Sequence, residues 1–434
     1  MSTLKAGFAR TDLNPPLGIS VDGYFEDRKA DGFRDRLHGS CIALSDGENT
    51  AVVFSIDLIG IRQKMGDDLR RLIAERTGLP YEAVFYACTH THTAPATSGG
   101  DAYSGDDAYN SVLFRLLADA ACEAVADLSD AEIYTNRGEV KDISFIRRYK
   151  MKNGRTQTNP GLFNPEIDHP ISTPDEMLQL VRLVREGKDD IVILNFQCHP
   201  DVIGGNKYSA DWPGFAVRAF EGAVPGTKCV LFNGAQGDTN HVDVYKGHSG
   251  YDHSRHMGMC IAGEAMKLYT YAEKDESEGT VGFMQYPLNV PTNRAPAEAI
   301  PEAERLIKLH EENRRDEVPF SGMEYITVIA EAYHMKKLEN WPDIYELHLC
   351  AVRFGNVAFT GIPGEPFTDV GRAIKEASPF KMTIPCCCAN GAEAYYPMKE
   401  AYDEGGYEAR SAEFASGVAE LIIDGSLKML NELY

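Results

Sequence analysis

Two histidines one residue apart are the part of the sequence best suited to chemistry. His90 and His92 follow the apolar run Val84–Cys88 in the segment VFYACTHTHTAP. The run predicts a buried strand, and in open α/β sheets ligands bind beyond the carboxyl ends of strands. On a continued strand the two side chains would share a face. The spacing suits two metal ligands, or one ligand beside an acid, base or substrate contact. Strand-end histidines that only hydrogen-bond the backbone would show the same pattern.

A strand followed by a histidine occurs a second time. Residues 190–197 (DIVILNFQ) predict a buried strand, and His199 follows it in Cys-His-Pro. A third short strand, residues 229–232, ends in the turn-rich segment NGAQGDTN, residues 233–240. We expect these two tips to lie at the same crevice as the HxH segment, because ligands bind at that edge of a sheet.

Three further segments carry residues that could bind a metal or polarise a carbonyl. They are residues 361–367 (GIPGEPF) with Glu365, residues 395–408 with Tyr395 and Tyr407, and the polar insertion 142–170 with Arg147. A loop as long as this insertion is usually functional or disordered inside a compact domain. A surface loop with solvated arginines is the simpler interpretation.

His253 and His256 have i, i+3 spacing in a predicted helix. An HxxH pair on a helix can bind metal, but the glutamate of an HExxH motif is missing here. We therefore interpret both as helix-surface residues, or as residues that support a site from behind.

The elements around these motifs alternate between strand and helix. The sequence predicts strands at 37–44, 51–58, 131–135, 280–291 and 381–388, helices at 65–77, 110–126, 296–314 and 411–433, and a hairpin of 345–354 with 357–360 around Gly355-Asn356. Residues 323–335 read as a mixed segment. The pattern predicts an α/β fold with a large mixed β-sheet core flanked by helices and a metal site at strand-end loops. We expect one catalytic domain over residues 1–434, with 275–340 as a peripheral subregion.

Composition excludes several classes of partner. The 434 residues carry a formal net charge of −22, which argues against nucleic acid and anionic membranes as partners. No run of 18 apolar residues occurs that would span a membrane, and the start of the sequence has no apolar signal-peptide core. The ten cysteines form no CxxC pair, which favours buried thiols in a reducing compartment. We expect a cytoplasmic protein with a small polar substrate, and a homo-oligomer stays open.

Taken in their order along the chain, the motifs resemble those of the neutral/alkaline (non-lysosomal) ceramidases, which are zinc-dependent amidases. AGFARTDLNPP…DGY is similar to that family's opening, VFYACTHTHTAP to its A-T-H-T-H-S-G-P, and residues 362–365 to its P-G-E. Residues 195–199 and 209–211 are similar to its second histidine strand and the following S-D segment. The tyrosines at 395 and 407 are similar to its terminal tyrosine pair.

The resemblance implies that four residues hold zinc: His90, His199, Glu365 and Tyr395. It also implies that His92 lies beside the metal, and that Arg147 and Tyr407 face the scissile carbonyl. Two imidazoles and a carboxylate form a known type of catalytic zinc site with a position open for water, and zinc lowers the pKa of that water to about 7. Tyrosine is an uncommon ligand, and the adjacent Tyr396 is an alternative to Tyr395.

The sequence also departs from the family. The family segment G-D-V-S-P-N is replaced by Gly237–Val242, so that Asn240 stands where ceramidases have a functionally important serine. Attack by zinc-activated water needs no serine, and we favour it over Thr239 as a shifted nucleophile. The family's secretion signal and its carboxyl-terminal immunoglobulin-like domain have no counterpart, which makes a long-chain ceramide an unexpected substrate.

We therefore expect a zinc-dependent hydrolase that cleaves a small polar amide, ester or lactone, with the carbon–nitrogen bond favoured. Asn240, Asp238, Trp212 and the 142–170 insertion are expected to shape its pocket. Two alternatives remain open. One is a non-catalytic relative that binds a metabolite or sugar. The other is a metal-dependent isomerase or lyase with His92 or Asp238 as the base.

Overall fold

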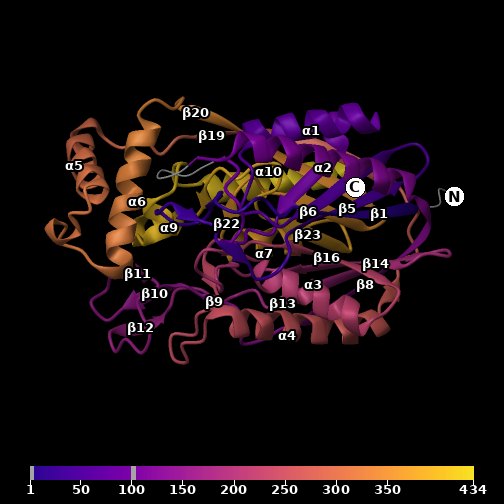
Figure 1. Ribbon diagram of the computed structural model, residues 1–434, viewed down its shortest axis with the longest axis horizontal. Helices are drawn as coiled ribbons and strands as arrows, with labels where there is room; N and C mark the ends of the chain where they lie inside the picture. The colour runs from indigo at the N-terminus through magenta and orange to yellow at the C-terminus, as the bar shows by residue number, and fades with distance from the viewer. Residues whose placement is uncertain (1–3, 99–103) are drawn as a thin grey trace.

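The computed structural model describes residues 4–98 and 104–434, and two β-sheets form its centre between helices (Figure 1). Among the described residues, the larger sheet has nine strands. In spatial order they are β16 (Thr227–Asn233), β14 (Asp190–Phe196), β13 (Met177–Arg185), β8 (Ser129–Glu139), β1 (Lys5–Asp12), β5 (His38–Ser45), β6 (Thr50–Ile56) and β7 (Val84–Cys88), and β18 (Glu273–Lys274) also pairs with β8. The sheet is mixed, because β14–β16 and β6–β7 are parallel pairs and its other pairs are antiparallel.

The second sheet packs on the inner face of the first. Its four strands, counted over the described residues, are β19 (Val281–Pro291), β20 (Ile344–Phe354), β21 (Val357–Gly361) and β23 (Met382–Cys386). Val53 of β6 and Ile193 of β14 lie in one apolar cluster with Val352 and Phe359 of the second sheet. Gly355 and Asn356 form the turn between β20 and β21, which confirms the predicted hairpin.

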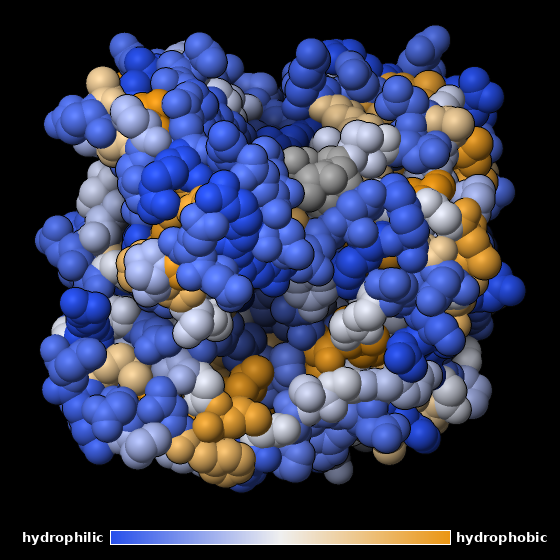
Figure 2. Space-filling view, turned by 60° about the vertical axis from the view of Figure 1, so that its left-hand side comes forward, coloured by the Kyte–Doolittle hydropathy of each residue, from blue (hydrophilic) through white to orange (hydrophobic). Residues whose placement is uncertain are grey.

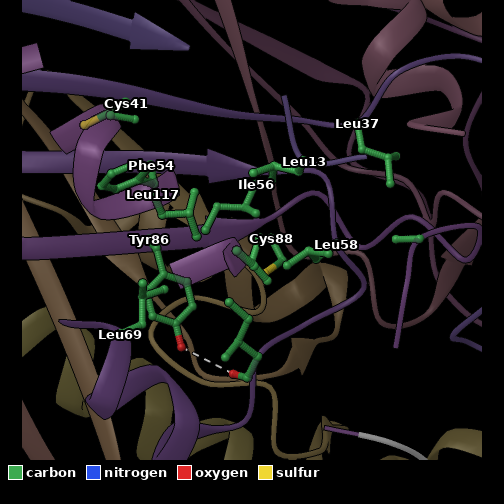
Figure 3. Packing of buried hydrophobic residues seen from close by; sticks show 14 of the residues in the cluster. Leu13, Leu37, Cys41, Phe54, Ile56, Leu58, Leu69, Tyr86, Cys88 and Leu117 are labelled. Carbon is green, nitrogen blue, oxygen red and sulfur yellow. Dashed lines mark hydrogen bonds between the residues drawn. The ribbon is translucent and has the colours of Figure 1, made fainter. Parts of the chain in front are cut away.

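Helices cover the outer faces of both sheets. Val52, Phe54 and Ile56 of β6 point away from the second sheet and pack with α1 (Gln63–Thr77) and α2 (Asp107–Ala126). Figure 3 shows Phe54, Leu117 and Tyr86 of this cluster together. β6 and β14 are buried on both faces, which explains why their sequences are continuously apolar instead of alternating.

The other half of the large sheet and the second sheet have their own helices. Helices α3 (Asp211–Ala223) and α4 (Gly250–Thr270) pack on β13, β14 and β16, and α4 runs along the lower side of the molecule in Figure 1. Helices α7 (Thr368–Ala377) and α10 (Val418–Leu433) pack on the second sheet. The layers run helix, sheet, sheet, helix, and the predicted α/β class with a large mixed sheet flanked by helices is confirmed. No helix in the described part of the chain combines the length and apolar character that crossing a membrane requires.

The predicted peripheral subregion 275–340 divides into two parts. Strand β19 belongs to the second sheet. Helices α5 (Ile300–Glu311) and α6 (Gly322–Leu338) instead form a hairpin with an apolar cluster of their own, at the left edge of Figure 1. The segment read as mixed, residues 323–335, is therefore helical. Helix α6 packs against the short helix α9 (Tyr407–Arg410), where Arg410 pairs with Glu324 at 3.1 Å.

The polar insertion 142–170 forms strands instead of an irregular loop. Strands β10 (Arg148–Met151), β11 (Thr156–Thr158) and β12 (Ile167–Pro170) make a small sheet, and β9 (Phe145–Ile146) pairs with β17 (Thr239–Asn240). The remaining short elements are β2 (Ser20–Val21), β3 (Arg28–Lys29), β4 (Gly32–Phe33), β15 (Lys207–Tyr208), β22 (Glu365–Pro366), β24 (Tyr395–Tyr396), α8 (Lys399–Glu404) and the 3-10 turns η1 (Tyr81–Ala83), η2 (Ala297–Ala299) and η3 (Arg315–Glu317).

Candidate metal centre

The tips of β7, β14 and β16 meet at one side chain. The amide Nδ2 of Asn233, at the end of β16, donates to the carbonyl oxygens of Thr89 (3.1 Å) and Cys198 (3.2 Å). The backbone of Cys387 donates to Asn233 O at 3.1 Å, which ties the end of β23 to the same point. These bonds explain how His90 and His199, which are 109 residues apart in the sequence, come together.

His90 and His92 reach the site through a turn. Strand β7 ends at Cys88, and His90 adopts a left-handed conformation with φ of 71°. Its backbone N–H donates to Leu58 O at 2.9 Å, just beyond the end of β6. The strand therefore does not continue through the two histidines, and the turn instead brings both rings to the same place.

Three imidazole nitrogens converge at the centre of the site. The Nε2 atoms of His90, His92 and His199 lie 3.0–3.4 Å from one another. Each Nδ1 atom faces a backbone carbonyl: Ile59 O for His90 (2.7 Å), Gly23 O for His92 (3.1 Å) and Gln236 O for His199 (3.5 Å). A carbonyl only accepts, so each Nδ1 carries a proton, and the Nε2 of a neutral ring presents its lone pair to the centre.

The carboxylate of Glu365 lies beside two of the three imidazoles. Its Oε2 atom lies 3.2 Å from His90 Nε2 and 3.7 Å from His199 Nε2, and it accepts from Gln236 Nε2 at 3.3 Å. The preceding Gly364 is needed, because a Cβ there would lie 2.3 Å from Ala394 O. Converging acceptors of this kind require a shared proton or a cation between them.

The donor set fits a divalent metal ion. Ligands 2.0–2.1 Å from a tetrahedral ion are about 3.3–3.4 Å apart, close to the separations of the three nitrogens. Of the residues that the structure describes, His90, His92 and His199 form the group whose potential ligand atoms all lie within 4.8 Å of one another, and all three are buried. His92, expected beside the metal, thus has the same position relative to the centre as the other two.

The protonation of the residues follows from burial and from Glu365. Burial lowers the pKa of His90, but the adjacent carboxylate outweighs this effect and raises that pKa to about 9. Burial, together with the charge of its cationic neighbours, holds the pKa of His92 and of His199 well below the ordinary value. Burial raises the pKa of Glu365 and the histidines lower it, with a net lowering. The site thus keeps one carboxylate and at least two neutral imidazoles, which are the forms that bind metal.

Arg147 and two tyrosines line the edge of the centre. Arg147 donates from Nε to Glu408 Oε1 (2.6 Å) and from Nη2 to Gly237 O (2.8 Å), and its Cζ lies 5.5 Å from the centre of the Tyr395 ring. It also hydrogen-bonds the Tyr395 side chain. The Tyr395 and Tyr407 rings meet edge to face at 5.8 Å. Glu408 is the residue of this group that sequence reasoning missed, because its role depends on a contact across 261 positions.

The structure separates Tyr395 from Tyr396. Tyr395 lines the cavity that contains His90, His92 and Glu365. Tyr396 points the other way: it is fully buried, donates to Pro363 O at 2.8 Å and stacks on Phe414. Of the two tyrosines, Tyr395 is the one on the side of the candidate metal centre.

Two cavities flank the centre. The first has about 240 Å³ and is lined by His90, His92, Glu365, Tyr395 and Tyr407, with charged groups from Arg62, Glu393 and Glu413. The second has about 180 Å³ and is lined by His199, Arg147, Asp201, Asn240 and His241. The side of the molecule that carries α5 and α6 is hollowed and largely hydrophilic in Figure 2.

Three residues expected to shape the pocket lie in different surroundings. Asn240 lines the second cavity and donates to Asn159 Oδ1 of the insertion at 2.7 Å. Asp238 lines neither cavity, because its carboxylate accepts from the backbone N–H (2.8 Å) and hydroxyl (2.7 Å) of Thr368 at the start of α7. Trp212 is fully buried against Phe196 in the apolar core. For Asp238 and Trp212 the geometry therefore indicates a structural role.

Solved structures of ceramidases share this architecture. No protein-family model matches the sequence. The crystal structure of neutral ceramidase from Pseudomonas aeruginosa superposes with a TM-score of 0.74 at 18% identity, covering 100% of this chain and 75% of that chain. A structure described as ceramidase complexed with C2 superposes with a TM-score of 0.70 at 18% identity, covering 100% of this chain and 76% of that chain. The chain therefore has a neutral ceramidase-like fold, with a buried group of three histidines that could hold a metal ion.

Proposed function

We propose that the protein is a zinc-dependent hydrolase that cleaves an amide bond in a small polar substrate. The observation that carries the proposal is the convergence of three imidazole Nε2 atoms and the Glu365 carboxylate beside a cavity. Nitrogen and carboxylate ligands in this number are typical of catalytic zinc sites. The likeness to two ceramidase structures favours an amide over an ester or lactone.

Zinc bound by these residues would supply a water molecule activated for attack and would polarise the substrate carbonyl. The chain's own contribution begins with orientation of the ligands. Each histidine ring is held by a backbone carbonyl on its Nδ1 side, and Gln236 holds the Glu365 carboxylate. Ligands fixed in this way lose little conformational freedom when the metal binds.

Arg147, Tyr395 and Tyr407 are suited to stabilise negative charge on the carbonyl oxygen. Burial raises the pKa of both tyrosines, so that both keep their protons at neutral pH and can donate hydrogen bonds. Burial alone would lower the pKa of Arg147, but Tyr395 and Glu408 raise it, so the guanidinium stays charged. A well-placed donor at a developing oxyanion contributes about 3–4 kcal/mol to the barrier reduction.

The two cavities favour a small polar substrate. Volumes of about 240 and 180 Å³ lie below the usual range of sites for drug-sized ligands. Arg62, Glu393 and Glu413 line the first cavity, and Asp201 and Asn240 the second. A long hydrocarbon chain would cover charged groups there without replacing their hydrogen bonds to water. A cytoplasmic setting stays a prediction from composition.

Metal analysis and turnover together test the proposal. We expect the purified protein to contain zinc, His199→Ala to lose one equivalent of it, and the exposed His169→Ala to retain the wild-type content. Wild-type and His169→Ala protein should hydrolyse at least one member of a panel of short acylated polar amines, and chelation should abolish turnover. Unchanged metal content in His199→Ala contradicts the metal centre, whereas bound zinc without turnover of any amide contradicts the hydrolase.

A further inference from the structure

Four histidines outside the candidate metal centre form a second group, which we call the peripheral histidine cluster: His241, His248, His253 and His256. His253 is in the middle, with its ring centroid 5.7 Å from that of His241, 5.5 Å from that of His248 and 6.0 Å from that of His256. The corresponding separations within the candidate metal centre are 4.7–5.0 Å. The peripheral rings are farther apart, and within the described residues no three ligand atoms of this cluster all lie within 4.8 Å of one another.

The cluster surrounds a cavity of its own. This cavity has about 490 Å³, and all four histidines line it together with Asp142, Asp243 and Asp252. Its one lysine, Lys246, is paired with Asp243 at 3.1 Å. Three segments build it: the residue after β17 is His241, the following loop supplies His248, and the first two turns of α4 supply His253 and His256. The carboxylates give the cavity a negative potential that favours a cation.

Two ring nitrogens of the cluster are buried without a partner. Among the described residues, neither His241 Nδ1 nor His253 Nε2 has a hydrogen-bond partner. His241 is 93% buried, since its exposed fraction is 7%, and it lines the cavity. His253 already uses a hydrogen bond to the backbone of His241, which leaves its other nitrogen free. Unpartnered buried polar atoms are rare in native proteins and call for a ligand or another explanation.

The two rings are neutral at physiological pH. Burial lowers the pKa of His241 to about 4, against the opposing effect of Asp201. Burial also lowers the pKa of His253, and the neighbouring His248 and His256 lower it further. Neutral imidazole is the form that binds metal, and it is the most common protein ligand of zinc, copper and nickel ions. His256 has a separate contact, because its Nε2 lies 3.5 Å from Cys260 Sγ.

We propose that His241, His248 and His253 bind a second divalent transition-metal ion, such as zinc, cobalt or nickel, in the peripheral cavity. Binding draws the ring nitrogens together around the ion, whose bonds satisfy the two unpartnered nitrogens. This site is independent of the proposed hydrolase function. His241 also lines the second cavity beside His199 and Asn240, so the ion fixes one wall of that cavity from behind.

Zinc stoichiometry of the full chain tests this site. Metal-free protein is dialysed against zinc buffered at micromolar free concentration, and the bound metal is measured by mass spectrometry. We expect two zinc ions per chain in the wild type and in the control His169→Ala, which removes an exposed histidine elsewhere. We expect one zinc in His253→Ala, one in His199→Ala and none in the double variant. Failure of the candidate metal centre would remove the His199-dependent ion alone, so the two proposals fail separately.

Cobalt provides a second readout. In His199→Ala the remaining cobalt should give a visible absorption spectrum, and His248→Ala should weaken that binding at least tenfold. His248 is exposed, so this substitution leaves folding intact even where His253→Ala does not. The same zinc content in His253→Ala as in the wild type, or filling of the His253-dependent site only at millimolar metal, would overturn the proposal.

Discussion

Glu365 and Tyr395 are register partners in the parallel pairing of β22 and β24, although they lie far apart in the sequence. The pairing places the carboxylate of Glu365 and the phenol of Tyr395 side by side at one edge of the candidate metal centre. The side chains of the next register pair, Pro366 and Tyr396, point in the opposite direction. One short ladder thus fixes the Glu365 carboxylate and the Tyr395 hydroxyl relative to each other.

Tyr395→Phe and Tyr396→Phe form a matched pair. If Tyr395 donates to the developing oxyanion, its loss should lower kcat about 100-fold, with the fold unchanged. Tyr396→Phe removes only the hydrogen bond to Pro363 O, which should cost about 1 kcal/mol of unfolding free energy and leave kcat near the wild-type value. Steady-state kinetics and urea unfolding measure both effects. Equal kcat values for the two variants would contradict the assignment of Tyr395.

The ion pair of Arg147 with Glu408 is expected to matter for stability. Glu408 is fully buried, and it also accepts from Thr158 Oγ1 at 2.7 Å. Glu408→Gln leaves the buried Arg147 without its counter-charge, which should cost about 3 kcal/mol of unfolding free energy. Glu302→Gln is the control, because it breaks an exposed pair with Arg305 and should cost less than about 1 kcal/mol. Urea unfolding measures both variants. Similar losses of unfolding free energy in the two would show that burial of the Arg147–Glu408 pair has no effect on stability.

Glu413 should make stability depend on acid pH. Burial raises the pKa of this carboxyl, but His334 (3.2 Å) and Lys337 (2.5 Å) lower it to about 2. A folded-state pKa below the unfolded value contributes stability above the unfolded pKa, and this contribution is lost as pH falls from about 4.5 to 2. Full loss corresponds to about 3 kcal/mol. Unfolding free energies of wild type and Glu413→Gln should converge over this range, and curves that stay parallel would refute the assignment.

Asp238→Asn distinguishes a helix cap from a catalytic base. The carboxylate accepts two hydrogen bonds from Thr368, so the variant should lose about 1 kcal/mol of unfolding free energy and keep a kcat within a few-fold of the wild type. A fall in kcat of several hundred-fold with unchanged stability would support the isomerase or lyase interpretation, in which Asp238 is the base.

Local patterns in the sequence were sufficient for the main elements. Apolar runs predicted β6, β7 and β14, because strands buried on both faces need apolar side chains throughout. The polar insertion was misread, because β10 to β12 pair mainly with one another and have no long apolar run. The mixed reading of residues 323–335 was wrong as well: α6 is buried on several sides by α5 and α9, which obscures a one-faced pattern.

Local sequence patterns are also insufficient for part of the candidate site. His90, His199 and Glu365 could be proposed from strand-end positions and the family resemblance, and the structure brings them together. The role of Asp238 depends on Thr368, 130 positions away, and no local signal reports such a contact. The turn at His90, with its left-handed backbone, depends likewise on a hydrogen bond to the segment after β6.

Anomalous diffraction at the zinc edge, from crystals of the zinc-loaded protein, tests the central claim most directly. The account predicts a peak enclosed by the Nε2 atoms of His90, His92 and His199 and the Oε2 atom of Glu365, and the loss of that peak in His199→Ala. A zinc-loaded crystal with no peak among these four atoms would contradict it.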